Sequence, residues 1–488
     1  MAVPNSSSLL YFLFCSLLLF SFSLEKSFAL EEKEAKQSHR LLHTHTLHLS
    51  SLFPDSTCSS SVKEANTNDN KKASLKVVHK HGPCSQLFQG KAKAPTHAQI
   101  LQADQSRVSS IHSRLTGKSN NRVSADATSI PAKSGSVVGS GNYIVTVGLG
   151  TPKNYLSLIF DTGSDLTWTQ CQPCAKYCYN QKETIFDPNK SNSYANISCT
   201  SATCALLTSG TSTSPGCSQS SSACTYGIQY GDQSYSVGYF SKDTLTLSPS
   251  DVIPNFLFGC GQNNRGLFGG SAGLIGLGRD KISLVEQTAQ KYGRYFSYCL
   301  PKSSSSTGFL KFGNTGASSK SIKYTPLSTL SLSGSFYAIQ LLGISVGGQK
   351  LSTPASVYQS SGTIIDSGTV ITRLPPTAYS ALSAEFKKQM SAYKSTSALS
   401  ILDTCYDLSG YTTVTIPKIS FLFGGGTTVD IDSTGILFAS SSSQVCLAFA
   451  PNGDDSDVAI FGNVQQKGFE VVYDIGGGKI GFGTGGCS

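Results

Sequence analysis

A six-residue pattern occurs twice in this 488-residue chain and contains the side chains best suited to chemistry. The first copy is Ile159–Ser164 and the second, 205 residues later, is Ile364–Thr369. Each copy reads apolar, apolar, Asp, hydroxyl residue, Gly, hydroxyl residue. An apolar strand that enters a glycine turn delivers its Asp where backbone N–H groups and hydroxyls can hold the carboxylate. Two such carboxyls in close proximity would share one proton and could serve as general acid and general base.

The pair carries more information than either copy. A lone Asp161-Thr162-Gly163 would be an ordinary turn. Two copies with matched flanks, one in each half of the body, predict a duplicated architecture. That architecture would place Asp161 and Asp366 symmetrically at an interface between two lobes.

The histidines narrow the possible mechanisms further. None of the eight histidines lies in residues 136–488. They are His39, His43, His45, His48, His79, His81, His97 and His112. If residues 136–488 are the mature protein, Ser/His/Asp hydrolysis, Cys/His proteolysis and His-ligated zinc chemistry are excluded. Carboxylates, hydroxyls, lysines and cysteines remain as candidate catalysts.

Length and composition predict a mostly β protein with two folded units. A chain of 488 residues is too long for one ordinary core, only 14% of it is charged, and 47 residues are Gly. Short strand signals recur between turn residues, for example at 142–147, 156–160 and 244–247. Within residues 136–488 only 377–390 are clearly helical. The sequence therefore predicts an all-β body with few short helices.

The N-terminus and the cysteines indicate export. Residues 9–24 form an apolar run that is short for a membrane span, and Ser27-Phe28-Ala29 offers small residues for cleavage. Residues 1–29 are thus predicted to be a signal peptide, with an uncleaved anchor as the alternative. Cys15 lies in that peptide, and 12 of the 15 Cys lie in residues 136–488, an even number that suits disulfides. A zinc site at Cys171, Cys174 and Cys178 would need a second pair at matching spacing, which does not follow.

Residues 30–135 form a basic segment predicted to be a propeptide. They contain 15 Lys and Arg against 8 Asp and Glu, whereas residues 136–488 contain 22 against 20. Residues 30 to about 75 are polar and predicted to be loose, 74–79 alternate like a strand, and 97–116 have helical spacing. A Ser/Gly stretch at 134–141 fits a processing region. Acidification that charges the histidines could release the segment from an acidic cleft, or the segment could simply be solvated.

Taken together, the motifs resemble the pepsin-like aspartic proteases, in particular the plant nepenthesin-type branch, over residues 136–488. Trp168 lies seven residues after Asp161, where the family has a Trp that supports a flap tyrosine, here Tyr230 in the segment 228–234. The segments 274–276 and 460–462 resemble the loops beneath the two Asp turns. The resemblance implies a bilobal double β-barrel with a catalytic cleft between an N-terminal lobe (136–327) and a C-terminal lobe (328–488).

The resemblance also implies an activity and roles for the supporting residues. The protein is expected to be an aspartic endopeptidase that hydrolyses peptide bonds at acidic pH with a water activated between Asp161 and Asp366. Neither a cofactor, a metal nor a covalent intermediate is needed. In the family the positions of Ser164 and Thr369 hydrogen-bond the outer carboxylate oxygens, and those of Thr162 and Ser367 reach across the lobe interface. Gly163 and Gly368 complete the two turns.

The cysteine-rich insertion at 171–224 resembles that of the nepenthesin branch. By that resemblance the expected pairs are Cys171–Cys174, Cys178–Cys260, Cys199–Cys224, Cys204–Cys217, Cys299–Cys487 and Cys405–Cys446, although sequence alone leaves the connectivity open. Two sequons in the insertion, at Asn189 and Asn196, are candidate glycosylation sites.

Two other functions compete with proteolysis. The chain also resembles chloroplast nucleoid DNA-binding members of the plant branch, and the basic upstream segment could contact phosphates. The second alternative is a catalytically inactive relative that binds proteins, as the protease-like xylanase inhibitors of plants do. Those inhibitors have typically lost part of the active-site pattern, whereas both Asp residues and Tyr230 are present here. For an active protease we expect peptide or protein substrates, the chain's own propeptide as a partner, a monomer, and no membrane contact after signal cleavage. The expected location is the secretory pathway and the apoplast, with the vacuole or chloroplast as alternatives.

Overall fold

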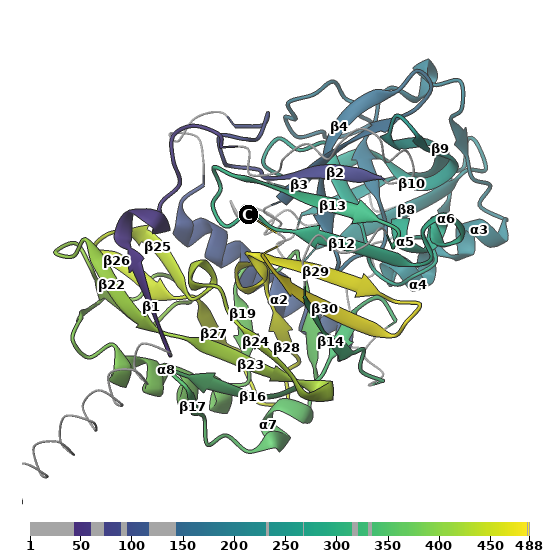
Figure 1. The fold of residues 1–488 in the computed structure, drawn as a ribbon. Helices are drawn as coiled ribbons and strands as arrows, with labels where there is room; N and C mark the ends of the chain where they lie inside the picture. The colour runs from purple at the N-terminus through teal and green to yellow at the C-terminus, as the bar shows by residue number, and fades with distance from the viewer. Residues whose placement is uncertain are drawn as a thin grey trace, which may run out of the picture.

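Two β-rich lobes form the body of the protein, with one helix lying where they meet (Figure 1). The computed structural model describes residues 43–59, 73–88, 95–116, 143–230, 234–266, 268–314, 321–329, 334–485 and 487. The predicted signal peptide (1–29), Cys15 and the predicted processing region lie outside these residues. The all-β, two-lobed prediction is confirmed.

The largest sheet runs through the N-terminal lobe and continues into the junction between the lobes. Among the described residues its order is β14 (Ile322–Pro326), β30 (Lys479–Thr484), β29 (Phe469–Asp474), β12 (Tyr295–Cys299), β13 (Thr307–Phe312), β2 (Ser74–His79), β3 (Tyr143–Leu149), β4 (Asn154–Asp161), β11 (Gly273–Gly276), β5 (Trp168–Gln170), β10 (Asp251–Arg265), β9 (Tyr235–Ser248), β8 (Cys224–Gln229) and β7 (Gly216–Cys217), with β6 (Ala195–Asn196) on β9. Strands β29 and β30 come from the end of the chain and lie beside β12 from its middle, so this sheet joins the two halves.

The C-terminal lobe contains three smaller sheets among the described residues. The first holds β15 (Tyr337–Ile339), β18 (Thr363–Ile365), β28 (Ala459–Phe461), β19 (Thr372–Leu374) and β27 (Phe449–Pro451). The second holds β17 (Gln349–Lys350), β16 (Leu341–Val346), β23 (Ile419–Phe423) and β24 (Thr427–Asp430). The third holds β20 (Lys394–Thr396), β21 (Cys405–Asp407), β26 (Gln444–Leu447) and β25 (Leu437–Ser441).

The helices are mostly short, as predicted. The two long ones are α2 (His97–Leu115) and α8 (Pro376–Gln389), which agree closely with the expected 97–116 and 377–390. Pro376 opens α8 at a position where its missing N–H costs nothing. The remaining helices are α3 (Ala202–Ala205), α4 (Leu207–Thr211), α5 (Leu284–Gln287), α6 (Ala289–Tyr292), α7 (Ala355–Gln359), α9 (Asn463–Gln466), η1 (Leu49–Leu52), η3 (Pro188–Lys190), η4 (Gly424–Gly426) and η5 (Ser433–Gly435).

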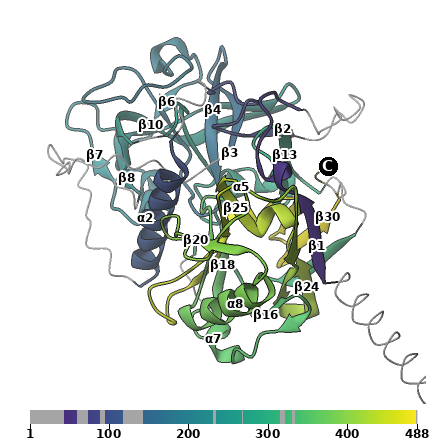
Figure 2. The same cartoon turned by 90° about the vertical axis from the view of Figure 1, so that its left-hand side faces the viewer.

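The segment upstream of residue 136 is built into both lobes. Strand β1 (Thr44–His48) pairs with β22 (Thr413–Pro417) of the C-terminal lobe, and β2 lies between β13 and β3 in the large sheet. Helix α2 then crosses the junction of the lobes, as both views show (Figures 1 and 2). The prediction that residues up to about 75 are loose is wrong for Thr44–Leu52. Only Leu47 and Leu49 are buried there, so the apolar pattern is too sparse to reveal a strand whose hydrogen bonds come from a distant edge.

Helix α2 packs its apolar face on the C-terminal lobe. Leu101 is fully buried in a cluster with Val370 and Ile371, and Val108 and Ile111 are buried in a second cluster that includes Phe336 and residues of β18 and β28. Burial of each such side chain contributes about 1.5–3 kcal/mol. No helix in the described part of the chain is long and apolar enough to cross a membrane.

Candidate active site

Each turn of the repeated pattern holds its Asp with the same set of donors. Asp161 ends β4, where Gly163 N–H donates to its Oδ1 (3.0 Å) and Ser164 Oγ to its Oδ2 (2.8 Å). Asp366 directly follows β18 and receives the equivalent bonds from Gly368 N–H (3.0 Å) and Thr369 Oγ1 (2.5 Å). Both carboxyls are buried. The two copies of the sequence motif therefore have the same hydrogen-bond geometry around their carboxylates.

The two turns face each other across the lobe interface. Thr162 N–H donates to Ser367 Oγ (3.1 Å), and Ser367 N–H donates to Thr162 Oγ1 (2.9 Å). A Cβ on Gly163 would lie 2.7 Å from Asp366 Oδ1, and one on Gly368 would clash with Asp161 Oδ1. Each turn therefore needs glycine, because the opposite carboxylate occupies the space of a side chain.

The loops expected beneath the turns lie there. The predicted segment 274–276 lies in strand β11, which runs parallel to β4. Leu277, directly after it, donates its N–H to Asp161 O (2.9 Å). Strand β28 runs parallel to β18, and Asp366 N–H donates to Phe461 O (3.1 Å). Each Asp is thus fixed through its main chain as well as through its carboxylate.

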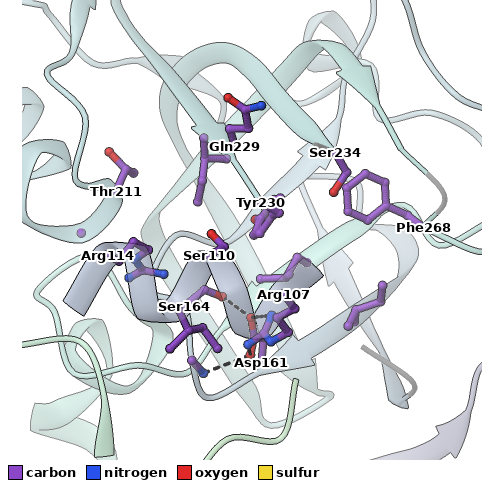
Figure 3. A pocket seen from close by; sticks show the side chains of 16 residues that line it. Arg107, Ser110, Arg114, Asp161, Ser164, Thr211, Gln229, Tyr230, Ser234 and Phe268 are labelled. Atoms are coloured by element: carbon purple, nitrogen blue, oxygen red, sulfur yellow. Dashed lines mark hydrogen bonds and ion pairs between the residues drawn. The ribbon is translucent and has the colours of Figure 1, made fainter. Parts of the chain in front are cut away.

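A single guanidinium from α2 binds both carboxylates. Arg107 Nη2 lies 2.7 Å from Asp161 Oδ1 and 2.9 Å from Asp366 Oδ2. Its Nη1 donates to Asp161 Oδ2 and its Nε to Asp366 Oδ2, both at 3.1 Å. Figure 3 shows Arg107 pointing from the helix to Asp161, with Ser164 beside the same carboxylate. The upstream segment therefore contacts the paired carboxyls directly.

A second ion pair lies one turn earlier on the same helix. Asp104 accepts from Val370 N–H (2.6 Å), Ile371 N–H (3.1 Å) and Arg373 Nη2 (3.0 Å). The side chains of Asp104 and Arg373 are fully buried. The sequence did not reveal Asp104 and Arg107 as site residues. Both lie on the apolar stripe of α2 that contains Leu101 and Val108, and charged residues in an apolar stripe are the signal that could have found them.

Arg107 changes the proton affinity of both carboxyls. Burial raises the pKa of Asp161, but the charge of Arg107 and the hydrogen bonds from Arg107, Ser164 and Gly163 outweigh burial, so its pKa lies below the ordinary value. The pKa of Asp366 is raised by burial and by the neighbouring Asp161 charge, against the opposing effect of Arg107. Burial disfavours the charge of Arg107 itself, but the two carboxylates outweigh burial and raise its pKa. The guanidinium therefore stabilises the ionised forms of the pair.

The predicted flap tyrosine lines a pocket beside Asp161. Tyr230 follows β8, and its Oη accepts a 2.7 Å hydrogen bond from Nε1 of the buried Trp168. Phe268 packs edge-on against both rings. Figure 3 shows Tyr230 and Phe268 on the side of the pocket opposite α2. Residues 231–233 of the predicted hairpin lie outside the described part.

The structure corrects the expected disulfides near the start of the insertion. Cys171–Cys174 and Cys178–Cys260 are wrong; the bonds are Cys171–Cys260 and Cys174–Cys178. Strand β5 runs parallel to β10, which brings the Cα atoms of Cys171 and Cys260 to 5.3 Å. This contact between distant strands has no trace in the cysteine spacing.

A second pair of expected disulfides is exchanged as well. Cys199–Cys224 and Cys204–Cys217 are wrong; the bonds are Cys199–Cys217 and Cys204–Cys224. Burial distinguishes the two bonds, because Cys204 and Cys224 are both in the core whereas Cys217 is exposed. Cys299–Cys487 and Cys405–Cys446 are as expected. Cys58 and Cys84, unassigned by the sequence, form one further bond within the upstream segment.

The remaining sites considered from the sequence are two glycosylation sequons and a possible zinc site. Asn189 and Asn196 are both exposed, as a glycan requires, and their glycosylation stays a prediction. Within the described ranges no three His, Cys, Asp or Glu side chains are grouped so that they could hold a metal ion. Cys171, Cys174 and Cys178 are all in disulfides.

Two lobes that meet at paired Asp turns define a pepsin-like arrangement, and comparison with known proteins agrees. The chain matches the family models described as xylanase inhibitor N-terminal, over residues 143–314, and xylanase inhibitor C-terminal, over 336–484. An aspartyl protease family protein of Arabidopsis thaliana is 58% identical over 91% of this chain and 93% of its own. Aspartyl protease AED1 of A. thaliana is 50% identical, over 94% and 95%. Aspartic proteinase nepenthesin-2 of Nepenthes gracilis is 39% identical, over 69% and 76%.

The chain therefore belongs to the pepsin-like aspartic protease family, in its plant nepenthesin-type branch. Solved structures support the fold. Basic 7S globulin from soybean superposes with a TM-score of 0.57 at 21% identity, over 71% of this chain and 92% of that one. Conglutin gamma from lupine seeds gives 0.56 at 20% identity, over 70% and 91%.

Proposed function

We propose that this protein is an aspartic endopeptidase and that the structure describes its inactive precursor. One observation carries the proposal: Asp161 and Asp366 meet face to face, and Arg107 of the upstream segment binds both. Both carboxyls keep the full set of donors that hold them in place. Residues 30–135 would be the propeptide, and residues 136–327 and 328–488 the two catalytic lobes.

Once Arg107 has left, the pair can act on a peptide bond. Two adjacent buried carboxyls hold one proton between them, because a second negative charge nearby is unfavourable. The ionised carboxyl takes a proton from water as the water oxygen attacks the peptide carbonyl carbon. The protonated carboxyl donates to the carbonyl oxygen, and a proton then passes to the leaving amine. Ser164 and Thr369 hold the outer carboxylate oxygens throughout.

Arg107 opposes this chemistry in two ways. It occupies the position where water and the scissile peptide would bind, and it stabilises the doubly ionised pair, which has no proton to donate. Helix α2 adds an obstruction, because it lines the same pocket as Tyr230 and Phe268. Acidic conditions favour reprotonation of the pair and hence activity.

The test is digestion of a denatured protein across acidic pH by the full chain and by two variants. We expect pepstatin-sensitive cleavage by the parent, and losses of several thousand-fold or more in Asp161→Asn and Asp366→Asn, on the order of other disrupted catalytic groups. The matched control is Asp407→Asn, which removes an acid on β21 that contacts Ser409 rather than the cleft. Unimpaired cleavage in either Asn variant would contradict the proposal.

A protein-binding role is the second candidate, because the matching family models take their names from xylanase inhibitors. The intact donor sets around both carboxyls favour the enzyme. A parent that is freed of the upstream segment but cleaves no denatured protein would favour binding instead.

We further propose that the protein matures in the secretory pathway and acts in the apoplast. Seven disulfides among the described residues, including one in the upstream segment, support an oxidising compartment. Immunolocalisation of the tagged protein would distinguish the apoplast from the vacuole and the chloroplast.

A further inference from the structure

A carboxylate-binding cradle lies beside the candidate catalytic turn of the C-terminal lobe. Two backbone N–H groups, of Val370 and Ile371, and the guanidinium of Arg373 converge on the Asp104 carboxylate at 2.6, 3.1 and 3.0 Å. The cradle begins directly after Thr369, which holds Asp366. All three donors belong to the C-terminal lobe, so they stay in the protein when the upstream segment leaves.

Arg373 depends on this carboxylate. Its side chain is fully buried, and Asp104 is its ion-pair partner among the described residues. Its Nη1 reaches Ile371 O only at 3.5 Å, and its Nε has no hydrogen-bond partner within the described part of the chain. A buried guanidinium without a counter-charge is unfavourable, so removal of Asp104 creates a site that favours another carboxylate.

The position of the cradle relates it to the scissile bond. Asp104 and Arg107 are three residues apart on one helix, and Arg107 binds the paired carboxyls. Three helical residues advance by about 4.5 Å, and an extended peptide advances by about 3.3 Å per residue. A substrate strand in place of α2 would therefore bring a side chain within about two residues of the scissile bond to the cradle.

We propose that Val370 N–H, Ile371 N–H and Arg373 form a specificity subsite for an acidic side chain, Asp or Glu, of the substrate, and that Asp104 occupies it in the precursor. This inference depends on the proposed endopeptidase function. In the precursor, α2 thus fills two places at once: Arg107 occupies the catalytic pair and Asp104 occupies the acidic subsite. A planar guanidinium with two amide donors selects a carboxylate over a neutral amide.

The experiment uses the full chain with an exogenous protease site between α2 and β3, cut and freed of the upstream fragment. Peptides that differ only by Asp against Asn, or Glu against Gln, at each position near the cleaved bond are compared by kcat/KM. At one position we expect the acid to be preferred about ten-fold or more. Arg373→Met should abolish the preference and Arg373→Lys should retain part of it. Arg294→Met, at an exposed pair with Glu286, should leave it unchanged. Equal rates for acid and amide in the parent, or a preference that persists in Arg373→Met, would overturn the inference.

A binding arm separates failure of the subsite from failure of the proposed function. Two synthetic peptides of residues 97–115, one with the natural sequence and one with the substitution Asp104→Asn, are titrated against the cut parent by calorimetry. We expect the natural peptide to bind about ten-fold more tightly or better, and the difference to disappear with Arg373→Met. A parent that cleaves nothing yet shows this difference would refute the endopeptidase function while retaining the carboxylate site. Equal affinity of the two peptides for the parent would overturn the site itself.

Discussion

Arg107 is the residue on which the proposed inhibition depends, because one positive charge pairs with two buried carboxylates. Five of its N–H···O contacts with Asp161 and Asp366 lie between 2.7 and 3.1 Å. Its planar fork allows this double contact, which the single ammonium of a lysine would reproduce poorly. Removal of the guanidinium takes the counter-charge from two adjacent buried carboxylates, so the pair must take up a proton and the docked state loses this ion pairing.

Arg107→Met is therefore expected to weaken docking of α2 by about 3–5 kcal/mol. The full chain should then process itself and cleave substrate at a higher pH than the parent. The measurement is the pH at which half of the chain is processed in a fixed time. The charge-matched control is Arg294→Met, which removes a guanidinium at an exposed pair with Glu286, away from α2. An unchanged midpoint in Arg107→Met would show that the contact does not restrain the enzyme.

At this scale the sequence predicted what local chemistry determines. The turns at Asp161 and Asp366, the glycines and the hydroxyl donors were all found, because each motif contains both a carboxylate and its donors. Arg107 and Asp104 were not found, because a helical pattern does not specify the surface on which the helix docks. Four of the six expected disulfides were wrong as well, and for Cys171–Cys260 the reason is the same, because that contact arises from strand pairing over 89 residues.

Among the elements, α2 combines a rigid start with a mixed docking face. Thr96 and Gln99 form a reciprocal capping box, in which Gln99 N–H donates to Thr96 Oγ1 and Thr96 N–H donates to Gln99 Oε1. The face that follows alternates buried apolar residues with Asp104 and Arg107. The cap satisfies backbone N–H groups at the start of the helix, ahead of the turns that carry these two charges.

Thr96→Ala should loosen the start of the helix by about 1 kcal/mol. Hydrogen exchange of α2 amides at neutral pH should then become about five-fold faster, since that free energy corresponds to such a factor in opening. Ser109→Ala, which removes only a helix-internal bond to Gln105 O on the exposed face, is the control. Exchange rates equal to those of the parent would show that the cap is not needed for docking.

The sequence located α2 and α8 to within a residue because each has a continuous helical period and a clear start. It missed β1, whose first residue Thr44 pairs with Pro417 of the C-terminal lobe. A short strand with few buried side chains is stabilised mainly by the strand with which it pairs, here β22. The sequence of β1 alone contains no information about that partner.

For the molecule as a whole, we expect the upstream segment to respond to pH through His79 and His81. Burial lowers the pKa of His79 to about 3 and that of His81 to about 2, with nearby Lys80 adding to the effect in both. In the released segment both would charge near the ordinary value of 6.5. The docked segment thus binds fewer protons, so docking is strongest above pH 6.5 and weakens as pH falls towards 3.

Other groups adjust this dependence. The charge of Arg107 acts to lower the pKa of both paired carboxyls, so its docking also weakens as they take up a proton. Burial raises the pKa of Asp104, although the charge of Arg373 opposes this effect. Protonation of Asp104 at low pH therefore favours docking and opposes the effect of the histidines. We therefore predict release on acidification, with His79 and His81 taking up protons first because the ordinary pKa of histidine is higher than that of the carboxyls.

A His79→Gln and His81→Gln double variant should therefore release the segment at lower pH than the parent. The plot of release against pH should lose a slope of about two protons. Release is measured by separation of the cut upstream fragment on a sizing column across about pH 3–7, the range over which the two histidines change charge. His48→Gln, at an exposed position of β1, is the control and should behave like the parent. Parent-like release in the double variant would refute a role for these two histidines.

Strand β2 gives the upstream segment a second kind of importance. It is hydrogen-bonded to β13 on one side and to β3 on the other, in the middle of the sheet that joins the lobes. Its departure opens two strand edges, each with a row of unpaired amides and carbonyls that must find water or another strand. A chain that unfolds after losing this strand no longer contains the template on which the sheet closed. Maturation would then be a one-way event, and the lifetime of the free enzyme would be governed by how slowly it unfolds.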